Sequence, residues 1–273
     1  MHGRRENIMR VLIVGDVHGR HDLLAEALHQ AWTDFRIAAA IQVGDFGFYE
    51  ELLDRARDAR LRFVVPVHVI DGNHEDHAWL RRALLAGAAQ VWRRELNLVF
   101  QPRPSVAQLG SCKVGFLGGA LHVDRPQRHN WLSGWPNYIL RRQREQAAAL
   151  FNKHHPDLII THSCPSRIGI GLCSATELRP GVADHITAAG FDAGPADDCG
   201  ELELNHLWSA LIRKPRAWVF GHFHRDHQAW VDGTQFVCVG DNWWSPERRL
   251  VIWDTEEKKL LICPADPSAD THP

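Results

Sequence analysis

The feature that most constrains this chain is a series of short apolar runs, each ending in polar residues beside glycine. Residues 11–14 (VLIV) lead into GDVHG, residues 39–43 (AAIQV) lead into GDFG, and residues 64–70 (VVPVHVI) lead into DGNHE. Short β-branched apolar runs bounded by glycine are typical of buried strands. Each expected strand therefore carries polar side chains to its carboxyl end.

Segments with apolar residues at helical spacing separate these runs. We expect helices over 21–34, 50–60 and 75–87, which gives the order β-α-β-α-β without hairpin turns between the strands. Strands joined by helices form parallel sheets whose faces the helices cover. The fold class predicted from this half of the chain is α/β.

The second half of the chain has a different pattern. Two apolar runs that meet near Gly110–Ser111 predict a hairpin. Further elements are expected as helices over 142–154 and 205–213, strands over 157–162 and 217–220, and antiparallel strands in QFVCVG, RLVIWDT and KKLLICP. We expect a single domain over 8–265, with a loop or cap insertion at about 163–204 and a frayed tail at 266–273.

Composition excludes several classes of protein. The net charge of −2 implies no strong global attraction to polyanions. No apolar run approaches the roughly 20 residues that span a bilayer, and the basic N-terminal segment lacks the features of a secretory signal. The six cysteines include no CxxC pair, which is typical of reduced thiols. We therefore expect a cytoplasmic protein without a membrane partner.

Two later strands end in the same way as the first three, in THS at 161–163 and GHFH at 221–224. Ligands of open α/β sheets bind beyond the carboxyl ends of the strands. All five polar clusters are therefore expected to meet at one edge of the fold. The side chains that they contribute are Asp16, His18, Asp45, Asn73, His74, His162, His222 and His224.

This set of side chains is typical of a transition-metal site. A single histidine at a strand end is more often an ordinary surface or core residue, so only the joint arrangement carries the prediction. Carboxylates mixed with imidazoles suit Mn, Fe or Zn better than Ca or Mg, which prefer oxygen ligands. Seven candidate ligands are too many for one ion and fit a two-metal hydrolase. Asp45, in the middle motif, is the natural bridging carboxylate.

The order GDVHG, GDFG, GNHE, a strand-end histidine and GHFH resembles the calcineurin-like metallophosphoesterase superfamily. The resemblance runs from residue 15 to 224. It implies a four-layer α/β/β/α sandwich with mixed sheets and two metal ions at one edge, most often Mn or Fe, with Zn as an alternative. It also implies an enzyme that hydrolyses phosphate monoesters or diesters, with a small or nucleotide-like substrate.

The same resemblance implies a role for each residue of the set. One metal takes Asp16, His18, Asp45 and His224, and the other takes Asp45, Asn73, His162 and His222. A hydroxide that bridges the metals is expected to attack the phosphorus atom. His74 is expected to face the substrate and to assist the leaving group rather than to bind metal.

Departures from family motifs narrow the substrate class. Where the Ser/Thr protein phosphatase branch has GDxVDRG, this chain reads GDFGFYEE, so a carboxylate partner for His74 is unidentified. The segment 118–135 is similar to a pattern in bacterial and phage members. From this segment and from 161–171 we expect substrate contacts by Arg125, Arg128, Trp135 and Arg167.

Two alternative functions remain open at this point. THSCPSRIGIG at 161–171 is similar to a motif of lariat-debranching nucleases, so a nuclease acting on RNA or DNA is one alternative. Those enzymes carry cysteine where this chain has His18, which argues against specific debranching. The other is a non-catalytic scaffold on the same fold, which the complete set of motif residues disfavours.

Overall fold

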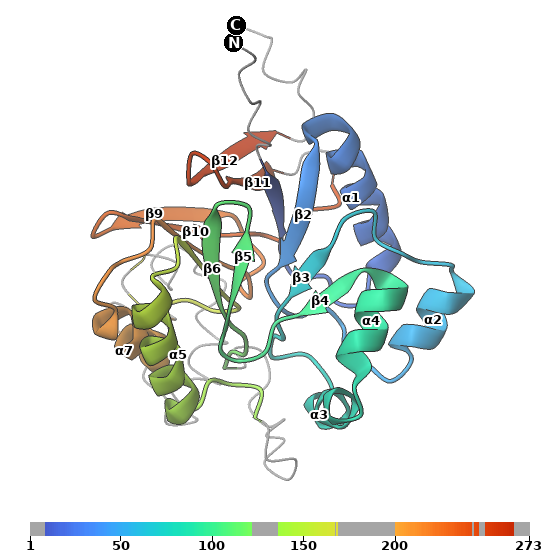
Figure 1. Cartoon of the computed structure of the whole chain (residues 1–273), viewed down its shortest axis with the longest axis horizontal. Helices are drawn as coiled ribbons and strands as arrows, with labels where there is room; N and C mark the ends of the chain where they lie inside the picture. The colour runs from blue at the N-terminus through green and yellow to red at the C-terminus, as the bar shows by residue number, and fades with distance from the viewer. Residues whose placement is uncertain are drawn as a thin grey trace, which may run out of the picture.

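The structure of this chain is a computed structural model. It describes residues 9–121, 136–166, 168, 200–241, 243–245 and 249–264. Within them two six-stranded sheets face each other, and helices lie on the outer side of each (Figure 1).

The first sheet has the strand order β12-β11-β1-β2-β3-β4. Its strands are β1 (Arg10–Val14), β2 (Ile37–Gln42), β3 (Val67–Val69), β4 (Leu98–Phe100), β11 (Arg249–Asp254) and β12 (Lys259–Pro264). The pairs from β1 to β4 are parallel, and β11 and β12 join the sheet as an antiparallel hairpin. The first sheet is therefore mixed, with a parallel core built by the predicted β-α-β-α-β segment.

The second sheet has the order β5-β6-β7-β8-β10-β9. Its strands are β5 (Ser105–Leu109), β6 (Cys112–Leu117), β7 (Leu158–Thr161), β8 (Ala217–Phe220), β9 (His227–Val231) and β10 (Thr234–Cys238). The strands β6, β7, β8 and β10 are parallel, whereas β5 and β9 are antiparallel edge strands. This sheet is mixed as well.

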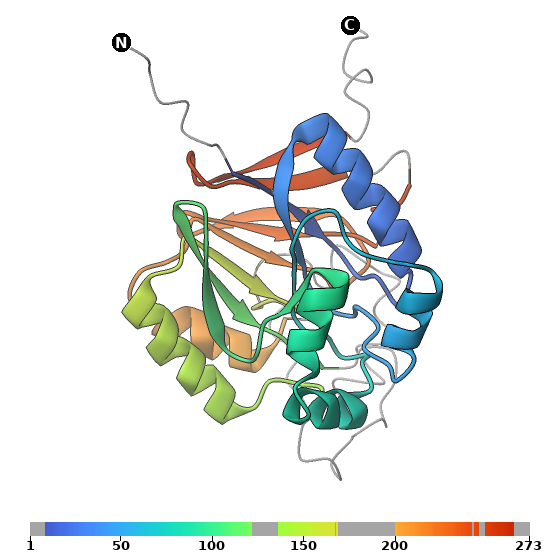
Figure 2. The same cartoon turned by 45° about the vertical axis from the view of Figure 1, so that its right-hand side comes forward.

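Six helices of the described chain form the outer layers (Figure 2). The helices α1 (His21–Phe35), α2 (Leu52–Asp58), α3 (His77–Leu85) and α4 (Ala88–Leu96) cover the first sheet, and α5 (Arg141–His154) and α7 (Leu202–Ala210) cover the second. A third apolar cluster, with Ile41, Phe116 and Val219 among its members, fills the space between the sheets. This arrangement confirms the predicted α/β/β/α sandwich. None of the helices in the described residues is long and apolar enough to cross a bilayer.

Three elements differ from the sequence-based expectation. The helix expected over 75–87 is α3, which ends at Leu85, and Gly87 with φ +84° separates it from a further helix, α4. The sequence analysis did not predict α4 or the short strand β4, which together complete another β-α-β unit. The strand β10 is parallel to β8, and its antiparallel partner is β9, which also was not predicted.

The two sheets bring their polar loops into contact at one edge. A Cβ atom on Gly221, after β8, would lie 2.2 Å from the Asp16 carboxylate that follows β1. A Cβ atom on Gly44, after β2, would lie 2.4 Å from the ring of His162, which follows β7. Only glycine permits these approaches between the sheets.

One buried imidazole in the first sheet gives the fold a pH dependence. His68 on β3 packs against Phe116 and accepts a hydrogen bond at Nδ1 from Gln101 Nε2, at 2.9 Å. Burial, aided by the nearby Arg93 charge, lowers the pKa of His68 from 6.5 to about 4. The unfolded chain therefore binds this proton first as the pH falls, and stability is lost between about pH 6.5 and pH 4.

We expect wild-type protein to be more stable than His68→Gln at pH 7.5 and to lose on the order of 2–3 kcal/mol of that advantage by pH 4.5. Guanidinium unfolding of the metal-stripped proteins at several pH values measures the difference, in which all other titrating groups cancel. A difference that stays constant with pH would show that His68 does not titrate differently in the folded chain.

Candidate metal centre

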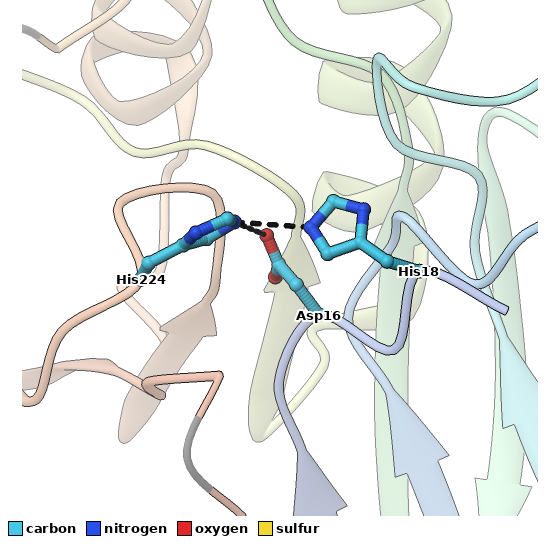
Figure 3. Close-up of side chains that lie close together, drawn as sticks. All are labelled: Asp16, His18 and His224. Carbon is cyan, nitrogen blue, oxygen red and sulfur yellow. Dashed lines mark hydrogen bonds and ion pairs between the residues drawn. The ribbon is translucent and has the colours of Figure 1, made fainter. Parts of the chain in front are cut away.

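Asp16, His18 and His224 form one cluster at the edge between the sheets (Figure 3). Asp16 is buried directly after β1, and one of its oxygens lies 3.1 Å from Nε2 of His224. The same nitrogen lies 3.1 Å from Nε2 of His18. Three donor atoms from two different sheets therefore point at one another.

A second cluster forms around His162, which follows β7 and is fully buried. Its Nδ1 lies 2.8 Å from the carbonyl oxygen of Val43 and donates to it. Its Nε2 lies 2.9 Å from Oδ1 of Asn73 and 3.2 Å from Oδ2 of Asp45. Anchoring one ring nitrogen on a backbone carbonyl leaves the other to face the cluster, as in metal-binding histidines.

Asp16 links the two clusters, because it belongs to both groups of donor atoms. Donor atoms of Asp16, Asp45 and His162 lie within 4.8 Å of one another, as do those of Asp16, His18 and His224. The sequence-based prediction placed Asp16 only on the metal that His18, Asp45 and His224 also bind, whereas its carboxylate lies close to donor atoms of both groups. The imidazole of His222 lies beside this region, with its ring centroid 5.0 Å from that of His162.

The donor atoms are better satisfied by metal cations than by hydrogen bonds among themselves. Oδ2 of Asp45 is buried and makes no hydrogen bond of acceptable geometry, although it lies near His162 Nε2. Leaving a buried carboxylate oxygen without a partner is costly unless a cation approaches it. The facing Nε2 atoms of His18 and His224 can form a hydrogen bond only when one of them carries a proton, whereas both can bind a metal when neither does.

The electrostatics favour positive charge at the same place. Burial opposes ionisation of Asp45, but His162 outweighs burial and holds the pKa of that carboxyl below its usual range. Burial also lowers the pKa of His162, yet Asp45 and Asp16 overcome it and raise the pKa to about 10. The pKa values of His18 and His222 are lowered, mainly by burial, so these rings stay neutral. The ionised Asp45 and the neutral rings of His18 and His222 have the protonation states that metals require, and a bound cation would take the place of the proton on His162.

The backbone of the ligand loops is in unusual conformations. His18, Asp45, His222 and His224 have φ between 49° and 69°, a region that non-glycine residues seldom adopt. Backbone amides hold the carboxylates in return: His74 N donates to Asp45 Oδ1 at 2.8 Å, and His222 N donates to Asp16 at 3.1 Å. Such conformations persist where surrounding contacts over-determine them, as at functional sites.

The sequence analysis missed Glu75 as a support of the site. Its buried carboxylate accepts hydrogen bonds from the amides of Phe46, Gly47 and Phe48, at 2.8, 3.0 and 2.6 Å. These amides belong to the loop that directly follows Asp45, so Glu75 fixes that loop against the loop of Asn73. Its position next to His74 in the GNHE motif is the sequence feature that could have identified it.

A second missed support is the buried ion pair of Asp71 and Arg103. Arg103 Nε donates to Asp71 Oδ1 at 3.0 Å, and Nη2 donates to Oδ2. Asp71 lies two residues after the end of β3 and two residues before Asn73, so this pair orients the Asn73 loop. Both side chains are fully buried, and removing one partner of such a pair typically destabilises a protein strongly.

His74 lies at the rim of the site, partly buried. Its ring centroid is 5.5 Å from that of His18, in an edge-to-face arrangement. Its carbonyl accepts a hydrogen bond from the hydroxyl of Tyr49 at 2.8 Å. The expected substrate contacts Arg125, Arg128, Trp135 and Arg167 lie outside the described residues, as do most of the insertion expected at 163–204 and the tail expected at 266–273.

A family model described as calcineurin-like phosphoesterase matches residues 9–226. The chain is a calcineurin-like phosphoesterase. The matched segment contains all eight residues of the site. This phosphoesterase is therefore an enzyme that acts on phosphate esters, and its family implies bound metal ions.

Solved structures share the fold of this phosphoesterase at low sequence identity. They include TT1561 of Thermus thermophilus, 14% identical, with a TM-score of 0.58 over 95% of this chain and 100% of that one. A dimetal phosphatase from Danio rerio is 14% identical, with a TM-score of 0.52 over 95% and 99%. A putative 5'-nucleotidase from Staphylococcus aureus is 16% identical, with a TM-score of 0.53 over 97% of this chain and 56% of its own. No curated protein matches the sequence.

Proposed function

We propose that this phosphoesterase hydrolyses a small or nucleotide-like phosphate ester at a two-metal centre, with His74 assisting the leaving group. The observation that carries the proposal is the buried Asp45 oxygen that has no hydrogen bond and that lies close to donor atoms of Asp16 and His162, in a group that shares Asp16 with the cluster of His18 and His224. A carboxylate in that position is suited to bind two cations at once. One cation would take Asp16, His18, Asp45 and His224, and the other would take Asp45, Asn73, His162 and His222.

Two bound cations would supply an activated water as nucleophile and would neutralise charge on the phosphoryl oxygens. The protein's own residues hold the donor atoms and orient the substrate. The Val43 carbonyl fixes the tautomer of His162, and amides of His74 and His222 fix the two aspartates. The carboxylate and imidazole donors favour Mn or Fe, with Zn as an alternative.

His74 is the side chain best placed for proton transfer in this proposal. It belongs to neither ligand cluster, it is partly exposed at the rim, and its backbone is held by Asp45 and Tyr49. A partly exposed imidazole beside the cluster can reach a substrate oxygen and carry a proton to it. General acid catalysis by a positioned histidine typically contributes about 10²–10⁴-fold in rate.

The proposal is tested by stripping the protein of metal and reloading it with Mn²⁺, Fe²⁺, Zn²⁺ or Mg²⁺. The assay compares p-nitrophenyl phosphate, bis-p-nitrophenyl phosphate, cyclic nucleotides and dinucleoside polyphosphates. We expect kcat/KM with Mn²⁺ to exceed that of the stripped protein at least about 100-fold on one or more of these esters. Full metal content without turnover of any ester would reject catalysis and favour a scaffold.

The same assay separates the nuclease alternative. Binding of RNA or DNA through several phosphates weakens steeply as salt rises, whereas hydrolysis of a small ester depends little on it. With a net charge of −2, we expect the weaker dependence.

A further inference from the structure

A cavity of about 320 Å³ lies between α3 and the segment that leads into α5. Figures 1 and 2 both show that segment passing beside α3. The cavity is lined by three arginines, Arg81, Arg103 and Arg142, and by Gln143 and Gln146 among others. Its volume is that of a small-ligand pocket.

The lining of the cavity is cationic. Among the described residues that line it none is acidic, and no ion pair joins Arg142 to a carboxylate in the described part of the chain. Gln143 accepts a hydrogen bond from the Leu140 amide at 2.9 Å, which leaves its NH₂ group as a donor. Arg142 and Gln143 also lie in the first turn of the 14-residue helix α5, where the helix dipole is positive.

Arg103 forms a rigid wall of the cavity rather than a ligand contact. It donates five hydrogen bonds, two to Asp71 and one each to the carbonyls of Pro136, Asn137 and Tyr138. All its N–H groups are therefore used, and Asp71 balances its charge. Arg81 and Arg142, whose side chains are exposed, are the other cationic groups of the lining.

We infer that this cavity binds a second phosphate-class anion, separate from the ester at the metal centre. Two guanidinium groups and a side-chain amide in one concave site are the donors that phosphate oxygens accept, and arginine binds them in a bidentate manner. The anion is either a second phosphate of the substrate or free inorganic phosphate. The first of these sources rests on the function proposed above, and the second does not.

The wall that Arg103 forms connects the cavity with the metal centre. Arg103 binds Asp71, and Asp71 precedes Asn73 by two residues, a separation of at most about 8 Å along the chain. In the first case, a second phosphate of the substrate would occupy the cavity while the ester bond lies at the metal centre. Such a substrate would be bound more tightly than one with a single phosphate.

Direct binding tests the inference without any turnover. Pyrophosphate and inorganic phosphate are titrated calorimetrically into metal-stripped wild-type protein and into Arg81→Gln/Arg142→Gln. We expect the dissociation constant to rise at least tenfold in the double variant. The matched control, Arg82→Gln/Arg93→Gln, removes two exposed charges from α3 and α4 that do not line the cavity, and it should bind within twofold of wild type.

Kinetics with Mn²⁺ then identify the source of the anion. A KM that rises in the double variant for a nucleotide with two phosphates, but not for p-nitrophenyl phosphate, assigns the site to the substrate. Weakened binding with both KM values unchanged assigns it to free phosphate. Equal binding by wild type and the double variant, or no binding by wild type, overturns the inference. Because the titration needs no turnover, an inactive enzyme would reject the proposed function and leave the binding result standing.

Discussion

Asp45→Asn is expected to lower kcat by about 10³-fold or more and to reduce the metal content from two ions per chain to one or none. The reason is the position of Oδ2, a buried oxygen without a hydrogen bond in the group of donor atoms that Asp45 forms with Asp16 and His162. Asparagine keeps the shape of the side chain but replaces one carboxylate oxygen with an NH₂ group, which cannot bind a cation. Both cations would lose a shared ligand and the negative charge that balances them.

Metal content by elemental analysis and turnover of p-nitrophenyl phosphate measure this effect. Asp58→Asn is the matched control, because Asp58 is an exposed carboxylate on α2, and it should leave both quantities unchanged. Circular dichroism of each protein separates loss of metal from loss of fold. An Asp45→Asn protein that keeps two ions and more than a tenth of the activity would show that Asp45 is not the bridging ligand.

His74→Asn is expected to lower kcat by about 10²–10⁴-fold while the metal content stays at the wild-type value. The loss should be larger for an alkyl phosphate than for p-nitrophenyl phosphate, because a poor leaving group depends more on a proton donor. This dependence on the leaving group distinguishes a proton donor from a residue that only shapes the site.

His206→Asn, an exposed histidine on α7, is the matched control and should have wild-type kinetics. If His74→Asn loses metal, His74 is a ligand and the role proposed for it is wrong. An equal loss for good and poor leaving groups would instead assign His74 to orientation of the substrate.

The sequence predicted the α/β class because its strands are short apolar runs with clear glycine boundaries, and the family resemblance of its motifs implied the sandwich. The strand over 11–14 and the hairpin turning at Gly110–Ser111 follow this rule, and both are present. The sequence did not predict α4, which begins directly after the glycine that ends the expected helix, or β4, which is only three residues long. The strand β9 alternates between partly buried and exposed residues at a sheet edge, which gives a weak signal.

The candidate site was predicted to the extent that its residues follow strands. The strand-end positions of Asp16, Asp45 and His162 were sufficient to bring them together at one edge. Glu75 and Arg103 could not be assigned in the same way. Glu75 acts through backbone amides of a distant loop, and Arg103 acts through a buried pair with a strand-end carboxylate, so their roles depend on tertiary contacts that have no local pattern.

The most direct measurement is anomalous diffraction at the manganese edge from crystals of the Mn²⁺-loaded enzyme. We expect two peaks, one against Asp16, His18 and His224 and one against Asn73, His162 and His222, with the Asp45 carboxylate in contact with both. A single peak, or two peaks of which either lies away from Asp45, would contradict the two-metal centre.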